Sequence, residues 1–437
     1  MKVLFAFLSG LSLVGLVMSL AQVQAARPNL ASLTGLLPSA QVAKLTASDG
    51  LGDDNLGYSV AASGDTVLVG AFGDDGSQGA AYVFVKPGGG WRGTLTQTAK
   101  LVASDGAAMD LFGFAVAISS DTIVVGAVGN NSGGDAAYVF VKPAGGWSGT
   151  LTETAKLTAG GAGGDTFAGT LALEGDTLVA GAPTSTIGPN SQQGAVYIFV
   201  KPGGGWVTTS TFTARLTASD GITNAAFGGS LALSGDTLIA GAPGFSTEPD
   251  PDAAYVFVKP GGGWVTTSTF AAKLTASDGV GTDVFGFSAA ISGDVVMVGA
   301  PDDDSNQGST YIFVEPGGGW NGALTETAKL TASDGAAEDR FGLSLAVISD
   351  TVVVGAPGDD SGLGSAYMVV KPDGGWVTTD TFAARLTASD GAIDNFFGFS
   401  AAASDGAVVI GAQGHDGARG SAYVFSQAFF YLPVILR

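Results

Sequence analysis

Residues 43–50 read A-K-L-T-A-S-D-G, and this phrase opens a unit that recurs seven times along the 437-residue chain. A Phe-Gly pair follows, then an apolar run, S-G-D-T, V-V-V-G-A-P, a loop and A-Y-V-F-V-K-P-G-G-G-W. The basic residue of the phrase stands at Lys44, Lys100, Lys156, Arg215, Lys273, Lys329 and Arg385. Successive copies are 56, 56, 59, 58, 56 and 56 residues apart. A nearly fixed period of this length predicts a repeat architecture.

Each unit contains four short runs with the composition of β-strands. In the fifth unit they are 285–291, 295–299, 309–314 and a fourth within 320–333. A Ser-Gly-Asp turn joins the first two, and a Pro-Gly-Gly-Gly stretch ends the third, because proline cannot donate to a sheet ladder. The second and third runs are apolar on both sides, so both faces of each sheet must be buried. The sequence therefore predicts an all-β fold, a seven-bladed β-propeller of four-stranded antiparallel blades.

The two ends of the repeat region predict how the ring closes. Residues 43–46 read as a fourth strand with no blade before it, and 423–425 read as a third strand with no fourth strand after it. Joining them completes the seventh blade and leaves no unpaired edge. The propeller is therefore expected over residues 43–425. All tryptophans occupy one repeat position, for which we favour packing between blades over a ring of sugar-binding platforms; they are Trp91, Trp147, Trp206, Trp264, Trp320 and Trp376.

Two motifs in these units resemble those of the FG-GAP repeat family, the blades of the integrin α-subunit propeller. The Phe-Gly pair stands at 112–113, 227–228, 285–286, 341–342 and 397–398, with Leu56-Gly57 in blade 1 and Phe167-Ala168-Gly169, read as one residue longer, in blade 3. Gly-Ala-Pro stands at 181–183, 241–243, 299–301 and 355–357, and ends in another residue in the other three copies. The resemblance implies a propeller with its ligand face on the loops around these motifs. The family's calcium loop is not carried over, because only a short Ser-Gly-Asp turn stands in its place and calcium requires about six to eight oxygen ligands.

The chain is acidic, with 39 Asp and Glu against 18 Lys and Arg and a formal net charge of −21. An acidic surface repels phosphate backbones and anionic headgroups, so we expect neither nucleic acid nor an anionic membrane surface as a partner. There is no cysteine, which excludes disulfides.

The segments outside the repeats suggest export. Residues 1–25 read as a signal peptide, with Lys2, an apolar run and a small-residue cleavage site; the alternative is a retained membrane anchor. Residues 26–42 are expected to form a linker or arm. The apolar tail 426–437 is too short to span a bilayer, and is either packed on the propeller or used for surface sorting. The mature chain is thus expected to have no membrane span and to form a monomeric ring.

One end of the predicted ring collects the acidic residues. We define the acidic loop face as the loops that enter the Phe-Gly strands and the loops that follow Gly-Ala-Pro. Runs of carboxylates there are candidate calcium ligands, namely Asp74, Asp75, Asp302, Asp303, Asp304, Asp359 and Asp360. The alternative is turn chemistry, because aspartate side chains accept bonds from nearby backbone N–H groups. No cofactor is otherwise indicated.

Signals for catalysis are sparse. His415 is the only histidine, no G-x-S-x-G elbow accompanies it, and the acidic residues follow the repeat. A glycosidase-type pair of carboxylates remains an alternative. The loops 184–193 and 245–252, the latter with Glu248, differ most from the other repeats. We expect a secreted or cell-surface, non-enzymatic adhesion module that binds protein or glycan on the acidic loop face. The alternatives are a structural assembly protein of the cell envelope and a hydrolase or lyase on a propeller scaffold.

Overall fold

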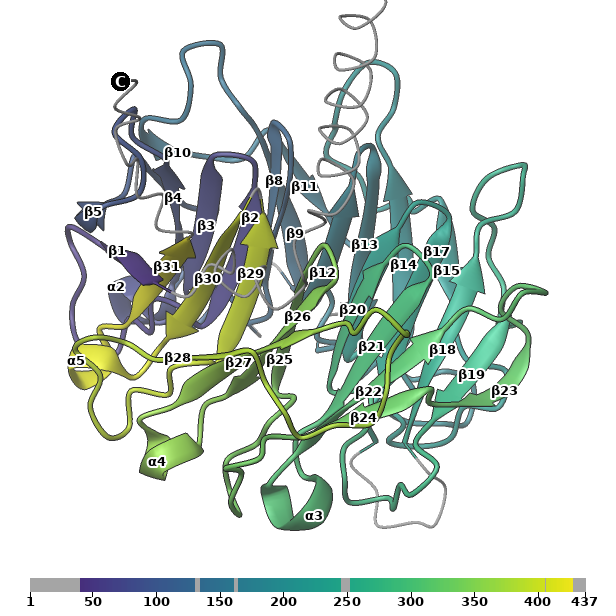
Figure 1. Ribbon diagram of the computed structural model, residues 1–437. Helices are drawn as coiled ribbons and strands as arrows, with labels where there is room; N and C mark the ends of the chain where they lie inside the picture. The colour runs from purple at the N-terminus through teal and green to yellow at the C-terminus, as the bar shows by residue number, and fades with distance from the viewer. Residues whose placement is uncertain (1–39, 130–133, 161–163, 245–251, 405, 427–437) are drawn as a thin grey trace, which may run out of the picture. The chain divides into compact units, whose positions relative to one another are not determined.

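The computed structural model describes residues 40–129, 134–160, 164–244, 252–404 and 406–426 (Figure 1). All of them belong to one compact unit. Its strands form seven sheets, which we number as blades 1 to 7 in the order of their first strands. The prediction of a seven-bladed, all-β propeller is confirmed; the only helices in the described part of the chain are four single turns.

The blades contain these strands, in sheet order from the first strand of each. Blade 1 has β2 (Ser59–Ser63), β3 (Thr66–Ala71), β4 (Ala80–Val85), β6 (Ala99–Leu101) and β10 (Gly149–Leu151); blade 2 has β7 (Ala115–Ser119), β8 (Thr122–Ala127), β9 (Ala136–Val141) and β11 (Ala155–Leu157). Blade 3 has β12 (Thr170–Glu174), β13 (Thr177–Ala182), β14 (Ala195–Val200) and β15 (Ala214–Leu216); blade 4 has β16 (Ser230–Ser234), β17 (Thr237–Ala242), β18 (Ala253–Val258), β19 (Ala272–Thr275) and β23 (Gly322–Thr325). Blade 5 has β20 (Ser288–Ser292), β21 (Val295–Ala300), β22 (Ser309–Val314) and β24 (Ala328–Leu330); blade 6 has β25 (Ser344–Ile348), β26 (Thr351–Ala356), β27 (Ser365–Val370) and β28 (Ala384–Leu386). Blade 7 has β29 (Ser400–Ser404), β30 (Ala407–Ala412), β31 (Ser421–Ser426), β1 (Ala40–Thr46) and β5 (Gly93–Thr96). The helical turns are α2 (Asp74–Ser77), α3 (Asp303–Asn306), α4 (Asp359–Gly362) and α5 (His415–Ala418).

The first strands of the seven blades contact one another in a closed cycle, so they line the axis of the ring. The second strands are apolar on both sides and are almost entirely buried. The core is divided into clusters of buried side chains, each shared by two adjacent blades. The tryptophans belong to these clusters and are at most 8% exposed, so their predicted packing between blades is confirmed.

The glycines of the two motifs let neighbouring blades approach closely. A Cβ atom on Gly241 of Gly-Ala-Pro would overlap the carbonyl oxygen of Gly286, the glycine of the next Phe-Gly pair. Gly286 itself has a φ of 98°, which favours glycine. Ser230 Oγ donates to the same carbonyl at 2.7 Å. The Gly-Ala-Pro motif of one blade and the Phe-Gly motif of the next therefore pack together and form the seam between the two blades.

The ring closes as predicted, because β1 pairs antiparallel with β31 from the far end of the chain. The strand starts at Ala40, so residues 40–42, assigned from the sequence to the arm, belong to blade 7. Figure 1 shows this purple strand beside the yellow strands of blade 7.

Two details differ from the sequence-based expectation. Three sheets have five strands, because β5, β10 and β23 add in parallel to the outer strand of the preceding blade. In addition, the Phe-Ala-Gly stretch of blade 3 contains no extra residue. Ala168, with a φ of 63°, takes the place of the motif glycine, and its N–H donates to Gly181 O at 2.8 Å.

The predicted signal peptide (1–25), most of the arm (26–42), nearly all of the tail (426–437) and Glu248 lie outside the described residues. In the part of the chain that the structure describes, no helix is both long and apolar enough to cross a membrane.

Candidate functional site

The acidic loop face is built around a cluster that repeats from blade to blade. In blade 5, Tyr311 on β22 and Lys329 on β24 are directly opposite each other across the two strands. Lys329 Nζ lies 2.7 Å from Asp278 Oδ2 and 2.7 Å from Asp303 Oδ2. The Tyr311 hydroxyl lies 3.0 Å from an oxygen of each carboxylate and shares its one proton between them. The ammonium also lies over the tyrosine ring, 5.3 Å from its centroid. One cation and one hydroxyl thus hold two carboxylates.

Six blades contain the cation, one paired aspartate and the tyrosine of this cluster, and blades 1, 5 and 6 also have the second, buried aspartate. The basic residue that opens a repeat pairs with the aspartate of the preceding Ser-Asp-Gly phrase in five of them and with Asp390 in the ring-closing blade. The same six cations lie over the tyrosine of the third strand, in the pairs Lys44–Tyr423, Lys100–Tyr82, Lys156–Tyr138, Lys273–Tyr255, Lys329–Tyr311 and Arg385–Tyr367. Sequence reasoning did not place these basic residues on the face. The signal was a constant separation, about 51 residues from aspartate to cation and 33 from aspartate to tyrosine.

The neighbouring charges shift the pKa values of Asp278, Lys329 and Tyr311. Partial burial raises the pKa of Asp278, but the Lys329 ammonium and the Tyr311 hydroxyl outweigh it, so the net shift is below the ordinary value. Burial likewise opposes the charge of Lys329, yet the carboxylates of Asp278 and Asp303 raise its pKa. Burial and the two carboxylates raise the pKa of Tyr311. Lys329 and Asp278 are therefore ionised at neutral pH, while the Tyr311 hydroxyl keeps its proton and remains a donor.

The predicted calcium ligands fall into two groups. Asp74, Asp303 and Asp359 are buried, and each is paired with the cation of its blade. Asp75, Asp304 and Asp360 are exposed, with φ near 50° in the single turns α2, α3 and α4. Asp302 lies 3.9 Å from Arg340 Nε.

The cation that the buried carboxylates hold in this structure is an ammonium or a guanidinium. Among the described residues, no three acidic or histidine side chains are grouped so that they could hold a metal ion. Ion pairing and turn formation account for the positions of these aspartates, and calcium binding stays a prediction. The Ser-Gly-Asp turns do not fit a calcium site, because each supplies one aspartate; Asp65, for example, pairs with Lys86 at 2.9 Å.

His415 occupies the position that Asp303 has in blade 5, eight residues before the tyrosine of the third strand. Its Nε2 lies 3.2 Å from Lys44 Nζ, which can only donate, and 3.5 Å from Asp390 Oδ2, an acceptor. Burial and Lys44 lower the pKa of His415, which keeps the ring neutral. Nδ1 faces Ser421 Oγ at 3.4 Å, and Ser421 is 1% exposed. The burial of Ser421 leaves no room for a substrate at its hydroxyl, so the pair does not fit nucleophilic catalysis.

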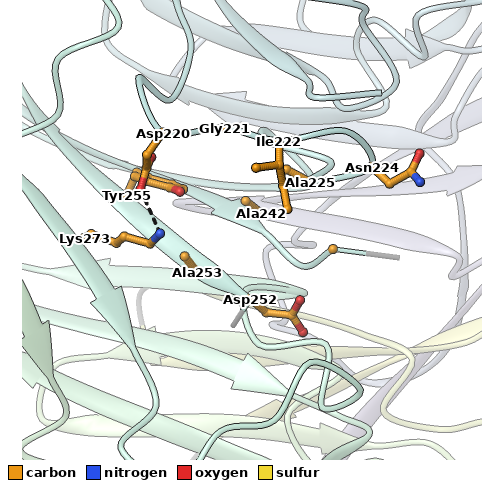
Figure 2. A pocket seen from close by; sticks show the side chains of 11 residues that line it. Asp220, Gly221, Ile222, Asn224, Ala225, Ala242, Asp252, Ala253, Tyr255 and Lys273 are labelled. Atoms are coloured by element: carbon orange, nitrogen blue, oxygen red, sulfur yellow. Dashed lines mark hydrogen bonds and ion pairs between the residues drawn. The ribbon is translucent and has the colours of Figure 1, made fainter. Parts of the chain in front are cut away.

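Blade 4 contains a small cavity of about 30 Å³ on this face, lined in part by Asp220, Tyr255, Lys273 and Asp252 (Figure 2). Asp252 ends the irregular loop 245–252 and is 8% exposed. Its carboxylate accepts the backbone N–H of Phe285. At the seam between blades 1 and 2 the corresponding Phe112 N–H donates to a backbone carbonyl, Gln78 O, instead. Asp252 therefore substitutes a side chain for a backbone acceptor at the seam between blades 4 and 5.

The second oxygen of this carboxylate, Oδ2, is buried and has no hydrogen-bond partner among the described residues. Burial raises the pKa of Asp252 to about 8, although the N–H groups of Phe285 and Val284 oppose the shift. Asp135 has the same position in blade 2, receives the Phe167 N–H at 3.2 Å and also has a buried oxygen without a partner. Neither residue was singled out from the sequence, because an aspartate before an apolar strand is a common turn signal.

The other irregular loop, residues 184–193, is fixed by its own polar groups. Ile187 and Asn190 exchange backbone hydrogen bonds, and Asn190 Nδ2 donates to Gln193 Oε1 and to Gly221 O, each at 2.9 Å. This loop of blade 3 is therefore anchored to blade 4.

Comparison with known proteins identifies the repeat. The model of a family described as FG-GAP repeat matches residues 40–84, 95–140, 151–199, 210–257, 269–313, 324–370 and 381–425. No curated protein sequence gives a significant match. A solved structure described as "Structure of Dos1 propeller" is similar at a TM-score of 0.47 and 14% identity, over 83% of this chain and 75% of that chain. A likeness at that level carries no argument about function.

Proposed function

The chain belongs to the FG-GAP repeat family, and on that premise we propose that it is a non-enzymatic binding module, secreted or displayed at the cell surface. In this proposal it recognises protein or glycan ligands, as an adhesion protein does, through the acidic loop face. Fold alone does not determine function, so the support must come from the surface itself.

Exposed apolar side chains on the acidic loop face carry the proposal. The loop after Asp-Gly presents a large apolar residue to solvent in five of the seven blades: Leu51, Met109, Ile222, Val280 and Ile393. Leu51 and Ile393 are 66% and 65% exposed. Single exposed apolar residues are ordinary, but here they recur in one loop of the repeat, within three residues after Asp-Gly, and stand beside exposed carboxylates such as Asp53 and Asp394. Apolar tips among charged groups are typical of a surface that contacts a partner.

The rigid attachment of these loops to the blades supports the same conclusion. The loops of the face are tied to the blades by the buried clusters of cation, aspartate and tyrosine, so the tips are held in place before a partner arrives. A preorganised surface loses less conformational entropy on binding. The non-enzymatic part of the proposal is supported by Ser421, the hydroxyl beside His415, which is buried out of reach of a substrate.

The test is a binding screen of the purified mature protein against cells, matrix proteins and a glycan array, with and without calcium. The variant Leu51→Ser/Ile393→Ser should lose at least about tenfold in affinity, because apolar contacts at the centre of an interface dominate binding. The matched control is Val207→Ser/Val265→Ser, which removes two valines that are similarly exposed in the segments after Trp206 and Trp264. Absence of binding under every condition, or equal loss in both variants, would refute the proposal.

A further inference from the structure

Blade 3 keeps the cation and the tyrosine of the repeated cluster but lacks its carboxylates. Arg215 on β15 and Tyr197 on β14 are directly opposite each other, in the register that Lys329 and Tyr311 have in blade 5. Five residues after Lys156, where Lys44 is followed by Asp49, the sequence has Gly161.

The second carboxylate is also missing from this blade. Eight residues before the tyrosine, where blade 5 has Asp303, blade 3 has Pro189. Gly161 lies outside the described residues, but it has no side chain that could supply an acid. Blade 3 is thus the one repeat whose sequence supplies neither of the two carboxylates.

The exposure and the contacts of the Arg215 side chain are those expected for a cation without a counterion. Arg215 is exposed, whereas the side chains of the six paired cations are between 14% and 29% exposed. Among the described residues, Arg215 forms no ion pair and does not lie over the Tyr197 ring, and the Tyr197 hydroxyl has no hydrogen-bond partner. The other six blades therefore serve as internal controls, since each shows what this pair of side chains binds.

The stretch of chain that contains Arg215 and Tyr197 has no acidic residue. Residues 177–219 contain neither aspartate nor glutamate, in a chain that has 39 of them. At physiological ionic strength, exposed charges more than about 8 Å away are largely screened. The stretch itself therefore supplies no carboxylate that would compete with an approaching anion for Arg215, despite the net charge of the protein.

We propose that Arg215 and Tyr197 form a binding site for a carboxylate, and that the carboxylate comes from an aspartate in a loop of a protein partner. The proposal rests on the binding function assigned to the acidic loop face and names its recognition site. A protein source is favoured because the six filled clusters all hold an aspartate of a protein loop. Arginine suits the role, since its planar fork can bind both carboxylate oxygens. Arg385 in blade 6 shows that an arginine at this position reaches several acids, at 3.1 Å from Asp334 and 2.7 Å from Asp359.

The site can be tested without knowing the partner. The probe is the peptide Ac-Ser-Asp-Gly-NH2, which copies the phrase that fills the other blades, and the matched probe is Ac-Ser-Asn-Gly-NH2. Binding is followed by NMR, from the Nε–H resonances of protein labelled with 15N-arginine. The chain has only seven arginines, so these resonances are few. We expect a saturable shift of the Arg215 resonance with an apparent Kd on the order of millimolar, because one exposed charged pair contributes little. The asparagine peptide should give no saturation.

Two variants locate the effect. Arg215→Gln should weaken binding of the aspartate peptide at least about tenfold, whereas Arg92→Gln, which removes an exposed arginine beside a glycine hairpin, should leave it unchanged. The proposal is overturned if the aspartate peptide does not saturate, if Arg215→Gln leaves its binding unchanged, or if Arg92→Gln abolishes it equally. It is also overturned if glucuronate binds at this resonance and the peptide does not, which would indicate a glycan. If the screen of cells and arrays finds ligands that Arg215→Gln still binds, this site fails while the general binding function stands.

Discussion

Replacing Asp252 with asparagine should remove a pH dependence of stability that the buried carboxyl creates. Burial raises the pKa of Asp252 to about 8, whereas an ordinary aspartate has a pKa of about 3.9. Between these values the folded chain holds a proton that the unfolded chain has released, so the free energy of unfolding falls as pH rises. Each pH unit corresponds to about 1.4 kcal/mol. From pH 5 to pH 7 the wild type should therefore lose up to about 2.7 kcal/mol relative to the variant.

Asparagine suits this comparison because its carbonyl oxygen can still accept the Phe285 N–H while its amide cannot ionise. The assay is urea unfolding of both proteins at pH 5, 6, 7 and 8. The difference between the two proteins in the free energy of unfolding, plotted against pH, isolates the contribution of the Asp252 carboxyl, because every other titrating group is the same in both. Asp373→Asn, an exposed aspartate in the hairpin after β27, is the control and should run parallel to the wild type. Curves for wild type and Asp252→Asn that stay parallel over this range would refute the reasoning.

Three further predictions concern the seams, the clusters and the closure of the ring. Gly241→Ala should destabilise the fold by roughly 2–4 kcal/mol, because its Cβ would overlap the Gly286 carbonyl; Gly261→Ala, which has open space, is the control in denaturant unfolding, and equal effects would contradict the close approach. Lys329→Met should cost about 1–3 kcal/mol by leaving two carboxylates without a cation, and calcium should raise the melting temperature of this variant more than that of the wild type; no difference in calorimetry would argue against carboxylates held by charge. Deletion of residues 40–46 should convert one cooperative calorimetric transition into a broader one at lower temperature, since blade 7 loses the strand that closes the ring; an unchanged transition would show that closure is dispensable.

The blades could be predicted from the sequence because their information is local. A strand such as β26 is apolar at every position, and the turn that precedes it lies within the same few residues. Burial on both faces follows from that composition alone. The closing strand could also be predicted, because β1 repeats the phrase that forms the fourth strand in every other blade.

Features that depend on pairing between repeats were not predicted. β5, with the sequence G-T-L-T, is mostly exposed and lacks an apolar pattern, so nothing local marks it as a strand. From the sequence, Lys329 is interpreted as an exposed charge. In the structure β24 places it opposite Tyr311, and the loop that contains Asp278 contacts both side chains. Ala168 was misread because the sequence shows the motif glycine displaced by one residue, while the backbone simply places alanine at a positive φ. For β5 and Lys329 the deciding contact joins residues about 50 positions apart in the chain.

The pairing of β1 with β31 also sets the order of events when the protein is made. Residues 40–46 leave the ribosome long before their antiparallel partner, residues 421–426, is synthesised. Throughout synthesis the first strand has no sheet to join on that side, and its exposed edge can pair with another chain. The intervening blades can form as they emerge, which brings the two ends together and shortens the search for closure. A nascent chain halted before residue 421 should therefore remain open to proteases and chaperones, and it becomes resistant only when the last strand is released.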